Sequence, residues 1–325
     1  MRTRRFGRLG WSISEIGYGA WQIGGNMWGE VGDRDAEAAI EAALEAGITF
    51  FDTALAYGRG RSEQVLGRVL KRTGMRERVY VATKVPPMDW EWPADHASKL
   101  QNIFPAHWIE QCTRESTEHL GFAPDIQQLH VWSDNWANDA EWSDALSALR
   151  ERGVIKAFGV SINDHEPDTA LKVVKSGKVD CVQVIYNVFD QTPETALFPA
   201  CLEHDVAVIV RVPLDEGSLG GKLTKETKFA AEDVRARYFK GKRLAQAVDH
   251  VEKLRPVLEN DEQTLAQGAL RFCLSHKAVT TVIAGSTKPA HIRDNAAVSE
   301  RGRLENEKIA ELRAHAWARN FYNAS

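Results

Sequence analysis

The sequence has few cysteines and no long hydrophobic run. Its four cysteines are widely spaced among 325 residues and form no C-x-x-C pair, which argues against a disulfide framework or a zinc site and favours a reducing compartment. No stretch approaches the about 20 apolar residues of a membrane-spanning helix. The N-terminal stretch is basic, but no apolar segment follows it, so we expect no secretory signal peptide. These absences predict a cytoplasmic protein that does not enter a membrane.

The sequence also lacks an excess of charge of either sign. Lysine and arginine number 41, aspartate and glutamate 45, and the formal net charge is −4. Without a basic excess we expect no binding to nucleic acid, and without an acidic tail we expect no disordered module. The hydrophobic content of 43% is that of a globular protein with a large core.

Short β-branched segments alternate with helical patterns along the chain. Eight strands are expected, at residues 16–19, 48–52, 79–84, 126–131, 155–161, 180–185, 206–211 and 280–284. The helical patterns between and after them cover residues 35–46, 62–71, 106–120, 140–150, 168–175, 195–204, 244–258 and 264–275. Asp33 and Ser62 are expected caps at two helix starts. Four glycines are expected to end helices in a left-handed conformation: Gly47, Gly121, Gly153 and Gly177.

Strict alternation of strand and helix predicts a parallel sheet with right-handed crossovers. Eight such units favour a (β/α)8 TIM barrel that forms a single domain over residues 1–325. A doubly wound open sheet is the alternative, but the stretch from Gly17 to Gln22 lacks the third glycine of the dinucleotide fingerprint. Residues 4–14 are expected to form an N-terminal β-hairpin, which can plug the bottom of a barrel.

Four polar side chains stand at or just after the ends of neighbouring strands. Asp52 and Tyr57 follow the second expected strand, Lys84 ends the third, and His130 ends the fourth. Because the carboxyl ends of barrel strands meet at one mouth, these four groups would share one cavity floor. Each of them alone is typical of an ordinary polar residue. It is their combination that points to catalysis.

These residues lie in segments that resemble the aldo-keto reductases. The stretch from Gly47 to Gly58 is similar to that family's first signature, and the segments ending at Lys84 and His130 are similar to its lysine and histidine segments. Further similar segments are Gly159-Val-Ser161-Ile-Asn163, Gln183-Val-Ile-Tyr186-Asn187, Pro213-Leu214 and Gly285-Ser286-Thr-Lys288-Pro289. The resemblance covers nearly the whole chain, and that family's fold is a (β/α)8 barrel.

The resemblance implies an oxidoreductase that reduces an aldehyde or ketone to an alcohol with NADPH, or with NADH as a second cofactor. Its partner would be a small carbonyl compound, and it would need no metal. Tyr57 would be the general acid, and Lys84, paired with Asp52, would lower the pKa of its phenol toward neutrality. His130 would orient the carbonyl by a hydrogen bond.

The resemblance also implies a set of cofactor-binding residues. Ser161, Asn163 and Gln183 would hold the nicotinamide carboxamide, and Arg211 would stack on the nicotinamide where many relatives have a tyrosine. The phosphates and adenosine would contact Leu214, Gly217, Leu219, Gly285, Ser286, Lys288, His291 and Asn295.

Cofactor choice depends on the cations that would face the 2′-phosphate of NADPH. Many relatives carry a basic residue at the position of Gly285 and an arginine at that of His291. Lys288 is then the main remaining cation, because Arg293 lies ~200° from His291 around a helix. We therefore expect a modest preference for NADPH, with turnover on NADH as well.

Three of the 10 tryptophans, Trp21, Trp90 and Trp132, are expected to line the substrate pocket. An aromatic pocket favours hydrophobic or planar carbonyl compounds. Two alternatives remain open at this point. The enzyme could oxidise a sugar or polyol with NAD(P), or the chain could be a redox-sensing regulatory subunit of the same fold. The sequence leaves the oligomeric state and the natural substrate undetermined.

Overall fold

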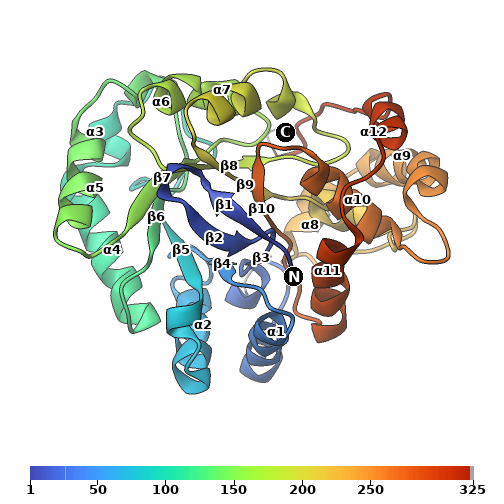
Figure 1. Ribbon diagram of the computed structural model, residues 1–325, viewed down its shortest axis with the longest axis horizontal. Helices are drawn as coiled ribbons and strands as arrows, with labels where there is room; N and C mark the ends of the chain where they lie inside the picture. The colour runs from blue at the N-terminus through green and yellow to red at the C-terminus, as the bar shows by residue number, and fades with distance from the viewer. Residues whose placement is uncertain (26, 323–325) are drawn as a thin grey trace.

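The computed structural model describes residues 1–25 and 27–322, and its centre is a closed barrel of parallel strands (Figure 1). In chain order the barrel strands are β3 (Ile16–Gly19), β4 (Phe50–Asp52), β5 (Tyr80–Val85), β6 (Ile126–Leu129), β7 (Ala157–Ser161), β8 (Cys181–Ile185), β9 (Ala207–Arg211) and β10 (Val279–Ile283). Each strand pairs with its neighbour in sequence, and β10 pairs with β3 to close the barrel. The closed order confirms the predicted (β/α)8 barrel and excludes an open doubly wound sheet.

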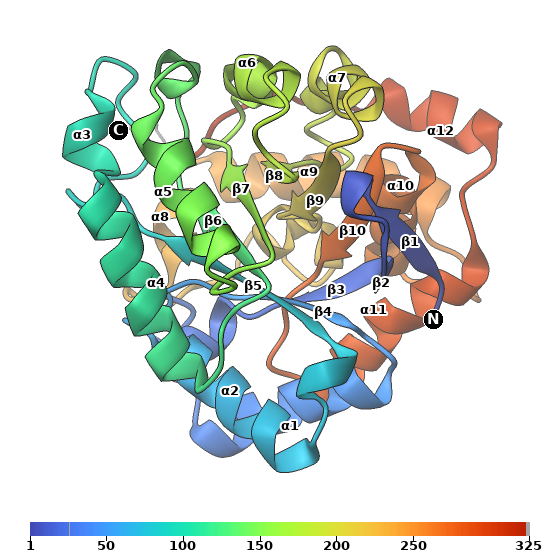
Figure 2. The same ribbon diagram turned by 60° about the vertical axis from the view of Figure 1, so that its left-hand side comes forward.

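Helices surround the strands, as Figure 2 shows for α1, α2, α4 and α5. The helices that cover the barrel are α1 (Asp33–Glu45), α2 (Arg61–Thr73), α4 (Ala106–Leu120), α5 (Glu141–Glu151), α6 (Leu171–Lys175), α7 (Leu197–Glu203), α9 (Arg243–Leu258), α10 (Leu265–Ser275) and α11 (Pro289–Arg301). Three further helices are α3 (Leu100–Ile103), α8 (Val234–Tyr238) and α12 (Asn306–Arg313). Within the described part of the chain, no helix combines the length and apolar character needed to cross a membrane.

The predicted helix ends were more accurate than the predicted helix starts. All four helix-ending glycines have positive φ, between 70° and 79°. The two predicted caps are wrong, because Asp33 is already the first residue of α1 and Ser62 lies inside α2. The Ser62 hydroxyl donates instead to the carbonyl of Ala20, which ties α2 to the loop after β3.

An antiparallel hairpin of β1 (Thr3–Phe6) and β2 (Trp11–Ser14) crosses the middle of the barrel in Figure 1. Phe6 is fully buried and stacks on Phe50 inside the barrel, with ring centroids 6.0 Å apart. Gly7, with φ of +42°, lets the hairpin backbone pass close to the chain before β9, because a Cβ at this position would lie 2.6 Å from the Asp205 carbonyl oxygen. The hairpin therefore closes the N-terminal end of the barrel, as expected.

Side chains along the strands alternate between the barrel interior and the helix layer. The interior positions nearest the hairpin are apolar: Phe50, Ala82, Ile126 and Cys181. Two residues further along the same strands the interior positions are polar: Asp52, Lys84, Gln128 and Gln183. Because every second side chain of a strand points into the barrel, the strands form an apolar layer near the hairpin and a polar layer at the mouth, where their carboxyl ends lie.

Candidate active site

A fully buried lysine forms the centre of the polar layer. The ammonium of Lys84 donates to Asp52 Oδ2 at 2.5 Å, to the Thr53 carbonyl at 2.8 Å and to the Tyr57 hydroxyl at 3.3 Å. The other Asp52 oxygen accepts from Gln183 at 2.7 Å and from Gln128 at 3.3 Å. Because all three ammonium donors are used, Lys84 is held in one position with its charge beside the phenol.

Tyr57 lies just after β4, in the loop that leads to α2, and faces the mouth. Burial raises the pKa of its phenol, and Asp52 raises it further, while Lys84 lowers it. The net direction is upward, so the expected lowering of this pKa toward neutrality is wrong: burial outweighs the ammonium. Burial also works to lower the pKa of Lys84, but Asp52 and Tyr57 together outweigh it and raise that pKa. At neutral pH the site therefore holds an ammonium next to a protonated phenol.

His130 lies next to Tyr57. Its ring packs edge-on against the Tyr57 ring, with centroids 5.6 Å apart. Burial, reinforced by Lys84 and Arg211, holds the pKa of His130 well below its usual value, so the imidazole is neutral. Its Nδ1 is buried and has no hydrogen-bond partner among the described residues. A neutral ring of this kind can hydrogen-bond a substrate oxygen without adding charge.

Aromatic rings flank the tyrosine and the histidine. The Trp21 ring centroid lies 6.2 Å from that of Tyr57, and the Trp92 centroid lies 5.6 Å from that of His130. Trp90 is 43% exposed and packs on Trp92 rather than on the catalytic groups. Trp92, on the loop between β5 and α3, packs against His130, although Trp90 was the tryptophan of this loop predicted to line the pocket. The periodicity of an irregular loop does not show where its side chains point.

The structure does not bring Trp132 to this cluster. Its side chain is fully buried, and its ring packs against Trp136 and Trp142 at centroid distances of 5.9 and 5.0 Å. The prediction that Trp132 lines the substrate pocket is therefore a miss. The residue belongs to the layer between the strands and the helices.

The predicted nicotinamide residues lie on adjacent strands at the mouth. Ser161 and Gln183 are register partners on β7 and β8, and both are buried. The Asn163 amide is turned toward another loop, since it accepts from the Ala94 N–H and donates to the Ala94 carbonyl, both at 3.2 Å. Ser161 and Gln183 thus lie side by side at the mouth, but the Gln183 amide nitrogen donates to Asp52, and the Asn163 side chain bonds to the Ala94 backbone. Their binding to the nicotinamide stays a prediction.

Arg211 ends β9 and reaches toward the same mouth. One of its terminal nitrogens donates to the Ile162 carbonyl at 2.9 Å and to the Asp164 carboxylate at 2.7 Å. Burial works to lower its pKa, but Asp164 and other neighbours raise it, so the guanidinium is charged. Its Nε is buried and has no partner among the described residues. This unsatisfied donor fits a site that is completed by a bound cofactor.

The loop after β9 carries Leu214, Gly217 and Leu219, the residues predicted to cover the pyrophosphate. It contains a short 3-10 segment, Asp215–Gly220, in which Asp215 and Glu216 have the positive φ values 49° and 52°. Leu219 is buried, whereas Leu214 and Gly217 are partly exposed.

The predicted adenosine residues surround the start of α11. Lys288 is the N-cap of α11, the Ser286 hydroxyl accepts from the Lys288 N–H at 3.1 Å, and His291 lies in the first turn. Gly285 precedes this turn, and Asn295 is buried one turn after His291.

Lys222, to which the sequence had assigned no role, also lies beside the predicted adenosine residues. The ammonium of Lys222 lies 3.3 Å from His291 Nε2. Burial lowers the pKa of His291, and Lys222 and Lys288 lower it further. No carboxylate forms an ion pair with Lys222 or Lys288 within the described residues. Two unpaired ammonium groups around one imidazole fit a phosphate, so the residues present suit a phosphorylated dinucleotide.

The barrel and the Asp–Lys–Tyr–His cluster at its mouth define a carbonyl-reducing barrel enzyme, and comparison with known proteins agrees. The model of the aldo/keto reductase family matches residues 15–316. The NADH-specific methylglyoxal reductase of Escherichia coli (strain K12) is 28% identical over 303 residues, 88% of this chain and 90% of that protein.

Solved structures are similar over nearly the whole chain. The holo form of the aldo-keto reductase AKR11C1 from Bacillus halodurans has a TM-score of 0.77 at 25% identity, covering 98% of this chain and 97% of that one. An aldo-keto reductase from Klebsiella pneumoniae in complex with NADPH has a TM-score of 0.70 at 25% identity, covering 97% and 95%. The chain belongs to the aldo/keto reductase family and is an NAD(P)H-dependent oxidoreductase that acts on a small carbonyl compound.

Proposed function

We propose that Tyr57 is the general acid with which this enzyme reduces an aldehyde or ketone to an alcohol. The observation that carries the proposal is the 3.3 Å contact between the buried Lys84 ammonium and the Tyr57 hydroxyl. The reduced nicotinamide, when bound, supplies a hydride to the carbonyl carbon. Tyr57 gives its proton to the carbonyl oxygen, and Lys84 stabilises the phenolate that remains.

The other residues at the mouth orient the substrate and the cofactor. The neutral His130 ring hydrogen-bonds the carbonyl oxygen beside Tyr57 and fixes its direction. Asp52 holds Lys84 in place. Ser161 and Gln183 hold the nicotinamide carboxamide, and Arg211 stacks on its ring. Trp21 and Trp92 form apolar walls, which favours aromatic or planar carbonyl compounds.

Tyr57 serves the reaction in both directions. Burial raises the pKa of its phenol, so it holds the proton that reduction requires. In the oxidation of a sugar or polyol the same residue would act as the base, so the cofactor ratio and the substrate supply set the net direction. The intact cluster of Asp52, Tyr57, Lys84 and His130 favours an enzyme over a regulatory subunit.

The proposal extends to the cofactor and the setting. Lys222, Lys288 and His291 favour NADPH over NADH, because the two ammonium groups attract the 2′-phosphate. The margin is modest, because none of the three offers the planar fork of an arginine. The chain would act as a single-domain enzyme over residues 1–325 in the cytoplasm, and the absence of charge excess fits a protein that binds no nucleic acid.

Multiple-turnover assays with an aromatic aldehyde test this function. We expect steady loss of the reduced nicotinamide absorbance, faster with NADPH than with NADH, and formation of the corresponding alcohol. A protein that binds NADPH tightly but turns over no member of a panel of aromatic, aliphatic and sugar aldehydes would contradict the proposal and favour the regulatory subunit.

A further inference from the structure

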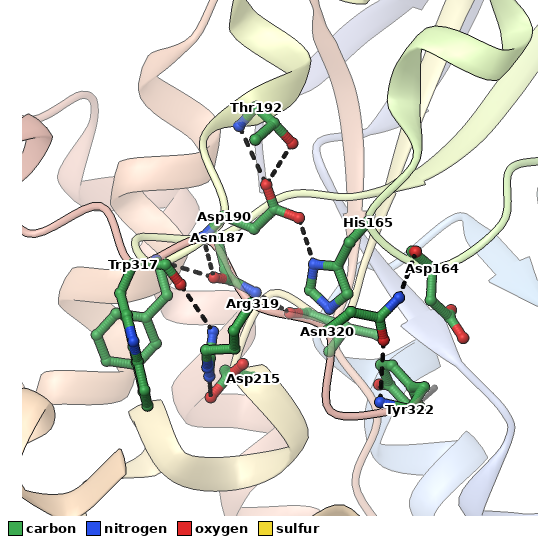
Figure 3. A network of polar contacts seen from close by, with 12 residues as sticks. Asp164, His165, Asn187, Asp190, Thr192, Asp215, Trp317, Arg319, Asn320 and Tyr322 are labelled. Carbon is green, nitrogen blue, oxygen red and sulfur yellow. Dashed lines mark hydrogen bonds and ion pairs between the residues drawn. The ribbon is translucent and has the colours of Figure 1, made fainter. Parts of the chain in front are cut away.

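The segment after α12 returns across the barrel mouth, and Figure 3 shows its polar contacts. The Trp317 N–H donates to the Phe189 carbonyl at 2.8 Å, and the Asn320 amide donates to the Asp164 carbonyl at 3.1 Å. These contacts fasten the segment to the loops after β8 and β7. The match to the family model ends at residue 316, so this segment lies just beyond it.

Arg319 of this segment binds the loop that follows β9. Its guanidinium lies 2.6 Å from Asp215 Oδ2, and the two side chains are only 8% and 1% exposed. The guanidinium also packs over the rings of Phe189, Trp317 and Phe321 at 4.1 to 5.0 Å. A buried ion pair of this kind is costly to break, because loss of one partner leaves the other charge uncompensated.

Tyr322 binds the next residue of the same loop. Its hydroxyl donates to Glu216 Oε1. Burial raises the pKa of Glu216 to about 7, and the neighbouring Asp215 and Asp164 raise it further, while Tyr322 and Arg211 lower it. Tyr322 is therefore one of two groups that favour the carboxylate form of a nearly neutral, buried acid.

The loop needs such support because its backbone is strained. Asp215 and Glu216 have φ values of 49° and 52°, which side chains with a Cβ rarely adopt. Residues in such conformations persist only where their surroundings hold them in place. Here Arg319 and Tyr322, from the C-terminal segment, bind the carboxylates of these two residues, and Phe321 packs beside them with Tyr238 of α8.

We propose that the segment Trp317–Tyr322 is a clamp that keeps the loop after β9 closed over the cofactor pyrophosphate, with Arg319 and Tyr322 as positioning residues. This inference depends on the proposed function and on the prediction, made from the family resemblance, that Leu214, Gly217 and Leu219 cover the pyrophosphate of the bound cofactor. Release of NADP(H) requires the loop to move, and movement of the loop breaks both contacts. The clamp therefore slows cofactor release without touching the reacting atoms.

The test measures NADPH dissociation from the full-length protein by stopped-flow fluorescence. Arg319→Met should raise the dissociation rate constant by ~10-fold, because a charged contact is lost. Tyr322→Phe should raise it by ~3-fold, because Glu216, with a pKa of about 7, is charged in only part of the molecules. Arg319→Lys should restore part of the loss because it keeps the charge. The control is Arg313→Met, whose ion pair with Glu194 is longer, at 3.6 Å, and lies outside the loop; it should leave the rate unchanged.

A second measurement separates positioning from general stability. With NADPH saturating, the single-turnover rate of hydride transfer should be unchanged in both variants, and only the Michaelis constant for NADPH should rise. Tyr322→Phe removes one oxygen atom, so it keeps the test decisive if Arg319→Met does not fold. Unchanged dissociation rates in folded variants would overturn the clamp proposal and leave the proposed function intact. If the wild-type protein bound no NADPH, both the clamp proposal and the proposed function would be wrong.

Discussion

At the scale of single residues, the site depends on the position of one buried ammonium. Lys84 contacts Asp52, Thr53 and Tyr57 at once, so the same charge is fixed by the carboxylate and available to the phenol. The carboxylate in turn accepts from two glutamine amides, which leaves neither of its oxygens unpaired. This arrangement explains how an ammonium can remain charged in the interior.

Replacing this ammonium should abolish catalysis. In Lys84→Met the phenolate left after proton transfer loses its counter-charge, so we expect reduction to slow by about 10²–10⁴-fold. The variant should also lose stability, because Asp52 becomes an uncompensated buried charge. The double variant Asp52→Asn, Lys84→Met should regain stability in urea unfolding but not activity. Full activity with an unshifted pH profile in Lys84→Met would show that Lys84 does not tune the acid.

The pH dependence of reduction follows from the direction of the Tyr57 shift. Because burial raises the pKa of this phenol above its usual value of about 10, the protonated form is present throughout the neutral range and is lost only as pH rises through that raised pKa. Single-turnover rates should therefore be flat from neutral to mildly alkaline pH and fall only above it. A fall that begins near neutrality would contradict the assignment of a protonated phenol as the acid.

At the scale of elements, two segments far apart in sequence form the expected phosphate site. Lys222 comes from the loop after β9, and Lys288 with His291 from the start of α11. Arg293, two residues after His291, points away and pairs with Glu45. The ammonium groups thus gather on one side of α11, and no carboxylate of the described residues forms an ion pair with them.

Cofactor preference should respond to these lysines. Lys222→Ala and Lys288→Ala should each raise the Michaelis constant for NADPH by roughly fivefold, equivalent to about 1 kcal/mol for one exposed cation, and leave that for NADH nearly unchanged. Lys225→Ala is the matched control, because Lys225 is in the same loop but pairs with Asp249 at 2.6 Å. Equal effects on both cofactors, or a wild-type enzyme that ignores NADPH, would refute the assignment.

The N-terminal hairpin should matter for stability rather than for chemistry. Phe6 is fully buried against Phe50 and Trp11, at the end of the barrel opposite the mouth. Phe6→Ala should lower the free energy of unfolding by about 3–5 kcal/mol, measured by urea denaturation, while the folded fraction keeps its kcat. Leu9→Ala, at a partly exposed position of the same hairpin, is the control and should cost much less. A large loss of kcat in folded Phe6→Ala would contradict this division.

At the scale of the whole molecule, the fold and the four catalytic candidates could be predicted because each has a local signal. Every strand begins and ends within two residues of its predicted range, since β-branched runs bounded by glycine and polar residues mark buried parallel strands. Asp52 and Lys84 could be placed because strand ends converge in a barrel. The short helices α3 and α8 were missed because four or five residues are too few to show a helical period.

What could not be predicted depends on contacts between distant segments. Trp132 was assigned to the pocket because its burial depends on the helix layer, which its position after a strand does not show. The pKa of Tyr57 was placed in the wrong direction because burial cannot be read from a charged neighbour alone. Lys222 and the contacts of Arg319 join residues 69 and 104 positions apart, and no local pattern records such pairs.

The most direct test of the account is single-turnover reduction by Tyr57→Phe. The preformed NADPH complex would be mixed rapidly with an aromatic aldehyde, and NADPH affinity would be measured in parallel by fluorescence titration. The account predicts that hydride transfer slows by about 10²–10⁴-fold while NADPH affinity changes little, because only the proton donor is removed. Hydride transfer within a few-fold of the wild-type rate would contradict Tyr57 as the general acid.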